Sequence, residues 1–226
     1  AHDSEVFLNG DKVGEHHCGY TAFTMDISGV LRYGEKNILV VKVDSREDLN
    51  IPPFGYVIDY MTYGGIYRDV YLDIKNTDYI EDIFIRTDIG QMDGQNAELI
   101  SEVTVQRTQE GLFLKQSLKH KKTGEYQPLG ESEISGTSMQ LSYPVENVIL
   151  WELEHPELYE VKTELICDGT LMDERIDRIG FRRAEFKKDG FYLNGKKIKL
   201  RGLNRHQSYP YVGYAMPKSM QQLDAD

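Results

Sequence analysis

The chain has 226 residues, of which 40% are hydrophobic and 11% aromatic, and this apolar content excludes an intrinsically disordered protein. The formal net charge of −11 and the lack of a large Lys/Arg cluster exclude an ordinary nucleic-acid-binding surface and suit a neutral substrate. No apolar run approaches the ~18 residues of a membrane span, so we expect neither a nucleic acid nor a membrane as a partner.

The two cysteines, Cys18 and Cys167, are far apart in the sequence. Two cysteines do not make a disulfide scaffold, and we predict two free thiols, with a single disulfide as the alternative. The low cysteine content and the lack of a signal-peptide pattern favour the cytoplasm. The chain begins with Ala1, so we expect it to be part of a longer protein, in which a preceding signal would make the protein secreted or periplasmic.

The first segment, residues 1–76, has the pattern of antiparallel β-strands. Asn9-Gly10 predicts a tight hairpin, because this pair adopts the positive φ angles of a type I′ turn. The β-branched run 38–43 predicts a strand covered on both faces, and residues 66–74 predict another strand. Between them, residues 50–63 form a long loop, and long loops on rigid sheets commonly carry binding sites.

The second segment, residues 77–183, has short strands at regular spacing. Residues 97–106 and 159–167 alternate between apolar and polar side chains, which is the pattern of half-buried strands. Gly-containing turns separate the strands, at 93–94, 123–124 and 168–169. About 100 residues of this kind are typical of an immunoglobulin-like sandwich.

The third segment, residues 184–226, changes character. It has a second Asn-Gly hairpin at 194–195, then the run Arg-Gly-Leu-Asn-Arg-His at 201–206, and a polar stretch after Pro217 that predicts a helix start. A strand, a polar loop and a helix make a β/α unit. A complete (β/α)8 barrel takes ~250 residues, so this segment is at most the start of one. We expect its apolar residues to be exposed, namely Leu200, Leu203, Tyr209 and Tyr211.

Several stretches of the chain, in this order, resemble glycoside hydrolase family 2. Residues 6–23 and 63–70 resemble the hairpin and the closing signature of the family's jelly-roll domain. Residues 151–159 and 180–182 resemble a Trp…Pro…Leu-Tyr element and a closing strand of its sandwich domain. Residues 193–206 resemble the start of its barrel. The resemblance implies a mainly β fold. A jelly-roll-type β-sandwich would occupy residues 1–76, an immunoglobulin-like β-sandwich 77–183, and the first β/α elements of a truncated (β/α)8 barrel 184–226.

The family's activity is retaining hydrolysis of β-linked sugars, which requires two carboxyl groups ~5–5.5 Å apart. In the family both are glutamates on barrel strands downstream of the Asn-Arg-His run, so the resemblance implies a chain that lacks its catalytic pair and is inactive by itself. The substrate would be a β-linked oligosaccharide or disaccharide, foremost a β-galactoside, with β-glucuronides and β-mannosides as alternatives. We expect no cofactor in this chain; the resemblance allows Mg or Na ions and a homo-oligomer in the parent protein.

The resemblance also implies substrate-binding residues. The family's β-galactosidases have an aspartate at the place of Asp59 that contacts the galactosyl hydroxyls, and a histidine at the place of His206 that contacts the sugar. The alternatives are a solvated loop aspartate and a histidine that hydrogen-bonds locally. Asn204 is a further candidate, although Asn204 and Arg205 also fit a structural role that ties the strand end to its neighbours. Gln207 departs from the acidic residue that the family often has after the histidine.

Two other clusters of residues resemble a metal site or a catalytic site, and for both a structural role is the better interpretation. His16, His17 and Cys18 cannot all meet one metal ion, because adjacent side chains on a strand point to opposite faces. Three glutamates at positions 152, 154 and 157 flank a Trp…Pro turn, where nothing would keep one of them protonated. We therefore predict no metal site and no catalytic residue in this chain.

A non-catalytic carbohydrate-binding or adhesive module is the alternative function, because two β-sandwiches can bind glycans without chemistry. The run at 201–206 and the helix start after Pro217 favour the enzyme, since a finished binding module has no use for them.

Overall fold

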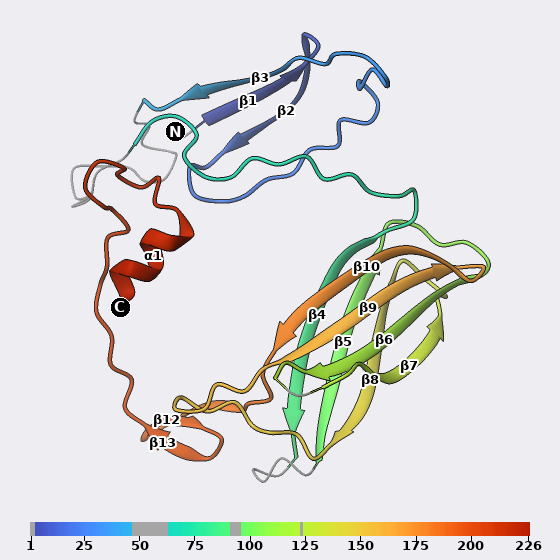
Figure 1. Ribbon diagram of the computed structural model, residues 1–226, viewed down its shortest axis with the longest axis vertical. Coiled ribbons are helices and arrows are strands. Elements are labelled where there is room, and N and C mark those ends of the chain that lie inside the picture. Colours follow the sequence, from blue (N-terminus) through green and yellow to red (C-terminus); the bar gives the residue numbers. More distant parts are fainter. Residues whose placement is uncertain (1–2, 47–62, 91–95, 123) are drawn as a thin grey trace. The chain divides into compact units, whose positions relative to one another are not determined.

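The computed structural model describes residues 3–46, 63–90, 96–122 and 124–226 (Figure 1). The chain divides into two compact units, one made of Ala1–Leu72 with Leu203–Asp226 and the other of Asp73–Gly202. Antiparallel sheets dominate both units, and the described residues form a single short helix. The prediction of a mainly β fold is confirmed.

The first unit is built on a three-stranded antiparallel sheet. Its strands are β1 (Asp3–Leu8), β2 (Asp11–His17) and β3 (Leu39–Asp44), in the order β2-β1-β3. Asn9 and Gly10 join β1 to β2 with φ angles of 56° and 98°, so the predicted hairpin is confirmed. The Asn9 side chain also hydrogen-bonds to residues distant in the sequence. Its Oδ1 accepts the Ile38 N–H at 3.1 Å and its Nδ2 donates to the Val30 carbonyl at 3.2 Å.

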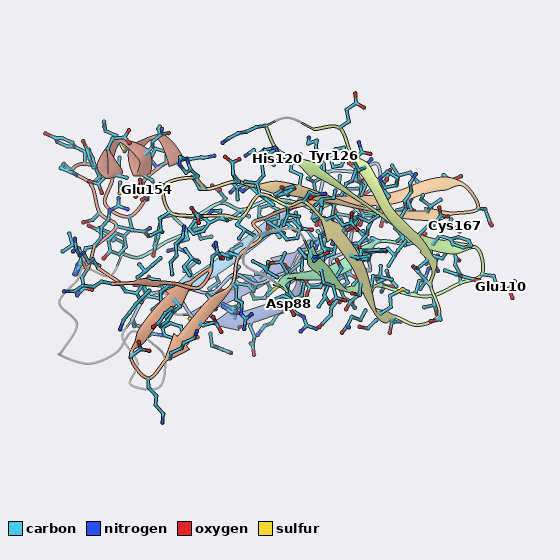
Figure 2. All side chains as sticks on the ribbon, turned by 90° about the horizontal axis from the view of Figure 1, so that it is seen from below. Asp88, Glu110, His120, Tyr126, Glu154 and Cys167 are labelled. Carbon is cyan, nitrogen blue, oxygen red and sulfur yellow. The ribbon has the colours of Figure 1, made fainter. Side chains whose placement is uncertain are left out.

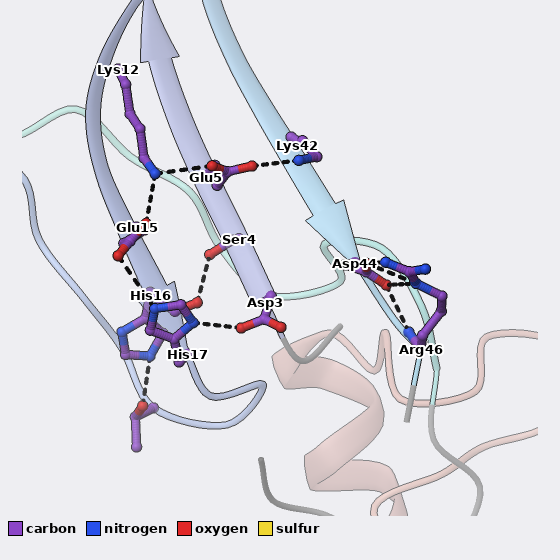
Figure 3. A network of polar contacts seen from close by, with 11 residues as sticks. Asp3, Ser4, Glu5, Lys12, Glu15, His16, His17, Lys42, Asp44 and Arg46 are labelled. Atoms are coloured by element: carbon purple, nitrogen blue, oxygen red, sulfur yellow. Dashed lines mark hydrogen bonds and ion pairs between the residues drawn. The ribbon is translucent and has the colours of Figure 1, made fainter. Parts of the chain in front are cut away.

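Ion pairs cross the polar face of this sheet (Figure 3). Glu5, on the central strand, accepts from Lys12 of β2 at 2.9 Å and from Lys42 of β3 at 2.5 Å. These two ammonium groups lower the pKa of Glu5 to about 2. The two ion pairs connect the central strand to both of its neighbours, although each lies near solvent and contributes little to stability by itself.

Two expectations for the first unit are wrong. Residues 38–40 are all more than half exposed, so β3 is not covered on both faces. Residues 66–74 form no strand, and Ile66, Val70, Tyr71 and Ile74 are exposed. A strand exists only where a neighbour takes its backbone hydrogen bonds. No strand among the described residues pairs with 66–74, and β1 is the only described partner of β3.

The second unit is an antiparallel β-sandwich of seven strands. A three-stranded sheet in the order β4-β5-β8 packs on a four-stranded sheet in the order β10-β9-β6-β7 (Figure 1). The strands are β4 (Ile80–Ile89), β5 (Asn96–Val105), β6 (Leu112–His120), β7 (Gln127–Glu133), β8 (Ser138–Glu146), β9 (Tyr159–Cys167) and β10 (Thr170–Ile179). This architecture confirms the predicted immunoglobulin-like sandwich.

Alternate residues of β5 and β9 fill the space between the two sheets. Leu99, Val103, Val161 and Leu165 are completely buried, whereas the side chains on the opposite face of each strand are exposed or half-buried, as the period-2 pattern predicted. Midway along the sandwich, apolar packing gives way to a buried hydrogen bond between the core strands. Gln116 Nε2 of β6 donates to Thr163 Oγ1 of β9 at 2.8 Å.

A small sheet and a helix complete the described chain. The sheet comprises β11 (Ala184–Lys187), β12 (Gly190–Leu193) and β13 (Lys196–Ile198), in sequence order. Asn194 and Gly195 join β12 to β13 with φ angles of 47° and 76°, which confirms the second predicted hairpin. Helix α1 (Lys218–Ala225) follows Pro217 and confirms the predicted helix start.

Candidate functional site

The run at 201–206 lies in an exposed segment that leads toward α1. Arg205 anchors this segment. Its Nε donates to Asp224 Oδ2 at 2.6 Å and its Nη1 to Gln221 Oε1 at 3.1 Å, and both partners belong to α1. These bonds connect Arg205 to α1, in keeping with the structural role predicted for it.

The predicted substrate-binding residues are brought together only in part. Asn204 and His206 are both exposed in the anchored segment, two positions apart. The prediction for Asp59 falls outside the described residues, and its role stays a prediction. Tyr63, four residues after Asp59, is described, and it belongs to the same compact unit as His206.

A tyrosine-rich turn follows His206, and the sequence did not single it out as a site. Tyr209 and Gly213 exchange two backbone hydrogen bonds, at 3.1 and 3.0 Å, and so close the turn. Gly213 has a φ of 56°, and a Cβ there would lie 2.8 Å from the Tyr63 ring, so only glycine fits. The Tyr63 ring also packs edge-on against Tyr214, with ring centroids 4.9 Å apart.

An open hollow of about 590 Å³ lies on this turn. It is lined by Tyr63 and residues 208–213, among which there is no charged side chain. Tyr63 and Tyr67 both pack against Tyr214, whereas Tyr211 is fully exposed. The alternation of Tyr with Pro210 and Gly213 was the sequence signal that could have revealed a turn.

The described residues contain no group of three His, Cys, Asp or Glu side chains placed to hold a metal ion. His16 instead contacts Thr21 through its Nε2 at 2.8 Å, and His17 pairs with Asp3 through its Nδ1 at 2.6 Å (Figure 3). Cys18 and Cys167 are both free thiols, as predicted. The use of Mg or Na ions by the parent protein stays a prediction.

Comparison with known proteins decides the family. A model described as "Glycosyl hydrolases family 2, sugar binding domain" matches residues 1–76, and one described as "Glycosyl hydrolases family 2" matches residues 78–182. The chain belongs to glycosyl hydrolase family 2. Among the residues that the structure describes, no helix is long and apolar enough to cross a membrane.

The proteins similar to this family 2 chain are named as β-galactosidases or β-glucuronidases. It is 42% identical to a β-galactosidase from Thermoanaerobacterium thermosulfurigenes and 38% identical to one from Thermoanaerobacter pseudethanolicus, over 99% of its length in both cases. The crystal structure of a Bacteroides uniformis β-glucuronidase matches 98% of the chain, with a TM-score of 0.83 and 32% identity. The chain spans only 32%, 30% and 28% of these three proteins, respectively.

The described glutamates near Trp151 do not resemble the acid of a family 2 active site. Glu152 pairs with Lys196 at 2.8 Å, and Glu157 pairs with Lys122 at 2.5 Å and His120 at 3.2 Å. The hydrogen bonds from Lys196 and Lys122 lower the pKa of the two carboxyl groups. A general acid needs a raised pKa, so neither Glu152 nor Glu157 has the electrostatic environment of one. Glu154, labelled in Figure 2, is exposed.

Proposed function

We propose that this chain is part of a retaining hydrolase that acts on β-galactosides, and that the 226-residue chain alone does not cleave them. The observation that carries the proposal is the match of 99% of the chain to two β-galactosidases, at 42% and 38% identity.

In this proposal the chain orients the sugar and another part of the protein cleaves it. His206 and Asp59 hydrogen-bond the hydroxyl groups of the galactosyl unit, and Asn204 supports that contact. Retention needs an acid/base and a nucleophile ~5–5.5 Å apart. The lowered pKa of Glu152 and Glu157 does not suit the acid/base role, and in this proposal both catalytic carboxyl groups come from outside this chain.

The test compares the 226-residue chain with the full-length protein on nitrophenyl β-galactoside and nitrophenyl β-glucuronide. We expect hydrolysis of the galactoside by the full-length protein only. Activity in the 226-residue chain would refute the missing catalytic pair, and a preference of the full-length protein for the glucuronide would refute the galactoside specificity.

The role of His206 is tested in the full-length protein by His206→Ala. Loss of one donor aimed at charge that develops in the transition state lowers kcat by about 10²–10³-fold. His155 is the matched control, because it is an exposed histidine beside the Trp151 turn, and His155→Ala should leave kcat unchanged. Equal kcat values in the two variants would remove His206 from the site.

A further inference from the structure

The turn after His206 holds one tyrosine in an unfavourable conformation. Tyr211 has a φ of 72°, in the left-handed region that residues with a Cβ rarely adopt. Its ring is nevertheless fully exposed, so burial of that ring does not offset the backbone strain. The surroundings impose the conformation, because the paired Tyr209 and Gly213 close the turn and the Tyr63 ring packs against Gly213.

Strained residues held by a rigid surrounding are concentrated where ligands are clamped. A tyrosine is a large contact surface with few rotatable bonds, so holding it in place costs little entropy when a ligand binds. Here the ring borders a hollow of about 590 Å³, a volume within the usual range for small-molecule sites. The turn therefore has the features of a preformed binding platform.

The chemistry of the hollow restricts its ligand. Residues 207–217 contain no Asp, Glu, Lys or Arg, although 28% of the whole chain is charged. The lining offers aromatic faces together with the hydroxyl groups of Tyr63, Ser208 and Tyr209. Aromatic faces bind apolar C–H surfaces and hydroxyl groups exchange hydrogen bonds. A pyranose ring presents both kinds of group and carries no charge.

We propose that Tyr211 is a specificity-determining residue that stacks on the sugar unit of the leaving group. The inference rests on the proposed function, in which His206 contacts the galactosyl unit that is cleaved. Tyr211 is exposed at the turn that follows this segment and lines the hollow there, and the inference assigns it the neighbouring unit, on the other side of the scissile bond.

The test uses full-length protein carrying Tyr211→Gly or Tyr211→Phe. Glycine removes the ring and also tolerates a φ of 72°, so the variant keeps its melting temperature. The measured quantity is kcat/KM for lactose divided by kcat/KM for methyl β-galactoside, which lacks a sugar leaving group. An aromatic contact of ordinary strength predicts that this ratio falls by about 3- to 10-fold in Tyr211→Gly, through KM for lactose. Tyr211→Phe retains the stacking face and should retain the wild-type ratio.

The matched control is Tyr33→Ala, which removes another exposed tyrosine ring from a turn of the same unit and should leave the ratio unchanged. A ratio that stays at the wild-type value in Tyr211→Gly would overturn the inference while the proposed function stands. A fall in melting temperature with equal losses on both substrates would also overturn it, because that result indicates a ring packed against protein. A wild-type protein that hydrolyses neither galactoside would refute the proposed function, and this inference with it.

Discussion

At the scale of single residues, Asp177 is the most unusual side chain of the sandwich. It lies on β10 opposite the buried Val161 of β9, so its side chain points toward the core. Its Oδ2 is buried and has no hydrogen-bond partner among the described residues. Burial raises the pKa of Asp177, and the negative charge of Asp82 on β4 raises it further, whereas Arg175 lowers it.

This environment makes Asp177 a source of instability at neutral pH. A carboxyl group whose pKa is raised by folding is more costly to ionise in the folded state, so the cost grows as pH rises from the ordinary pKa to the folded pKa and is fully present above it. We predict that Asp177→Asn raises the melting temperature at pH 7. The gain should vanish below the ordinary pKa of 3.8, where both states are protonated.

Thermal unfolding measured from pH 3 to pH 8 tests this prediction. Asp88→Asn is the control, because Asp88 is an exposed aspartate on β4 (Figure 2) and its replacement should change the free energy of unfolding by less than about 0.5 kcal/mol. A stabilisation by Asp177→Asn that does not depend on pH would contradict an electrostatic origin.

At the scale of elements, the two Asn-Gly hairpins share a second function beyond the turn. In both, the asparagine side chain binds a segment distant in sequence. Asn194 Oδ1 accepts the Arg183 N–H at 2.9 Å, and its Nδ2 donates to the Trp151 carbonyl at 3.0 Å. Asn194 is buried, so these bonds connect the small sheet to the end of the sandwich and satisfy the amide group of its side chain.

We predict that Asn194→Gly destabilises the protein by about 1–3 kcal/mol, because the Arg183 N–H and the Trp151 carbonyl lose their side-chain partner. Asn194→Ala should cost about 1 kcal/mol more, since alanine is also strained at a φ of 47°. Comparing the urea unfolding of the two variants separates the contribution of the hydrogen bonds to stability from that of the backbone conformation. Wild-type stability in Asn194→Gly would show that the turn alone matters.

These hairpins show which parts of the structure are encoded locally. Asn-Gly predicts a turn because the φ angles belong to the two residues themselves, and the alternation in 97–106 and 159–167 predicts strands because one face of each is buried. The run 66–74 has the same β-branched character and forms no strand, since pairing depends on a neighbour that no local pattern reveals. The bonds of Asn194 to Arg183 and Trp151 are equally invisible in the sequence.

The candidate site was predictable to a similar extent. The exposure expected for the C-terminal segment is confirmed for Leu200, Leu203 and Tyr211, whereas Tyr209 is half-buried by the turn that it closes. The anchoring of the Asn-Arg-His run by Arg205 was foreseen as a structural role, but its partners on α1 were not. The positive φ of Tyr211 lies within the turn that Tyr209 and Gly213 close, and the sequence alone does not show it.

At the scale of the whole molecule, the two compact units bury their apolar residues to very different degrees. The unit Asp73–Gly202 has two buried clusters between its sheets, centred on Leu114 and on Phe181. The other unit exposes large apolar side chains over 38–40 and 66–72. Apolar area removed from water is the main source of folding free energy, so the stability of the chain resides in the sandwich.

The sandwich should therefore fold without the rest of the chain. We predict that a protein of residues 73–202 unfolds cooperatively in urea, with an m-value of about 1–3 kcal/mol/M. Leu165→Ala in this protein should cost about 2–5 kcal/mol, because Leu165 is completely buried between the sheets. The same replacement at Leu171, which is half exposed on β10, should cost far less and serves as the control. Equal costs at the two positions, or a gradual transition, would mean that residues 73–202 lack a packed core when isolated. Cooperative unfolding with unequal costs would instead locate that core between the two sheets.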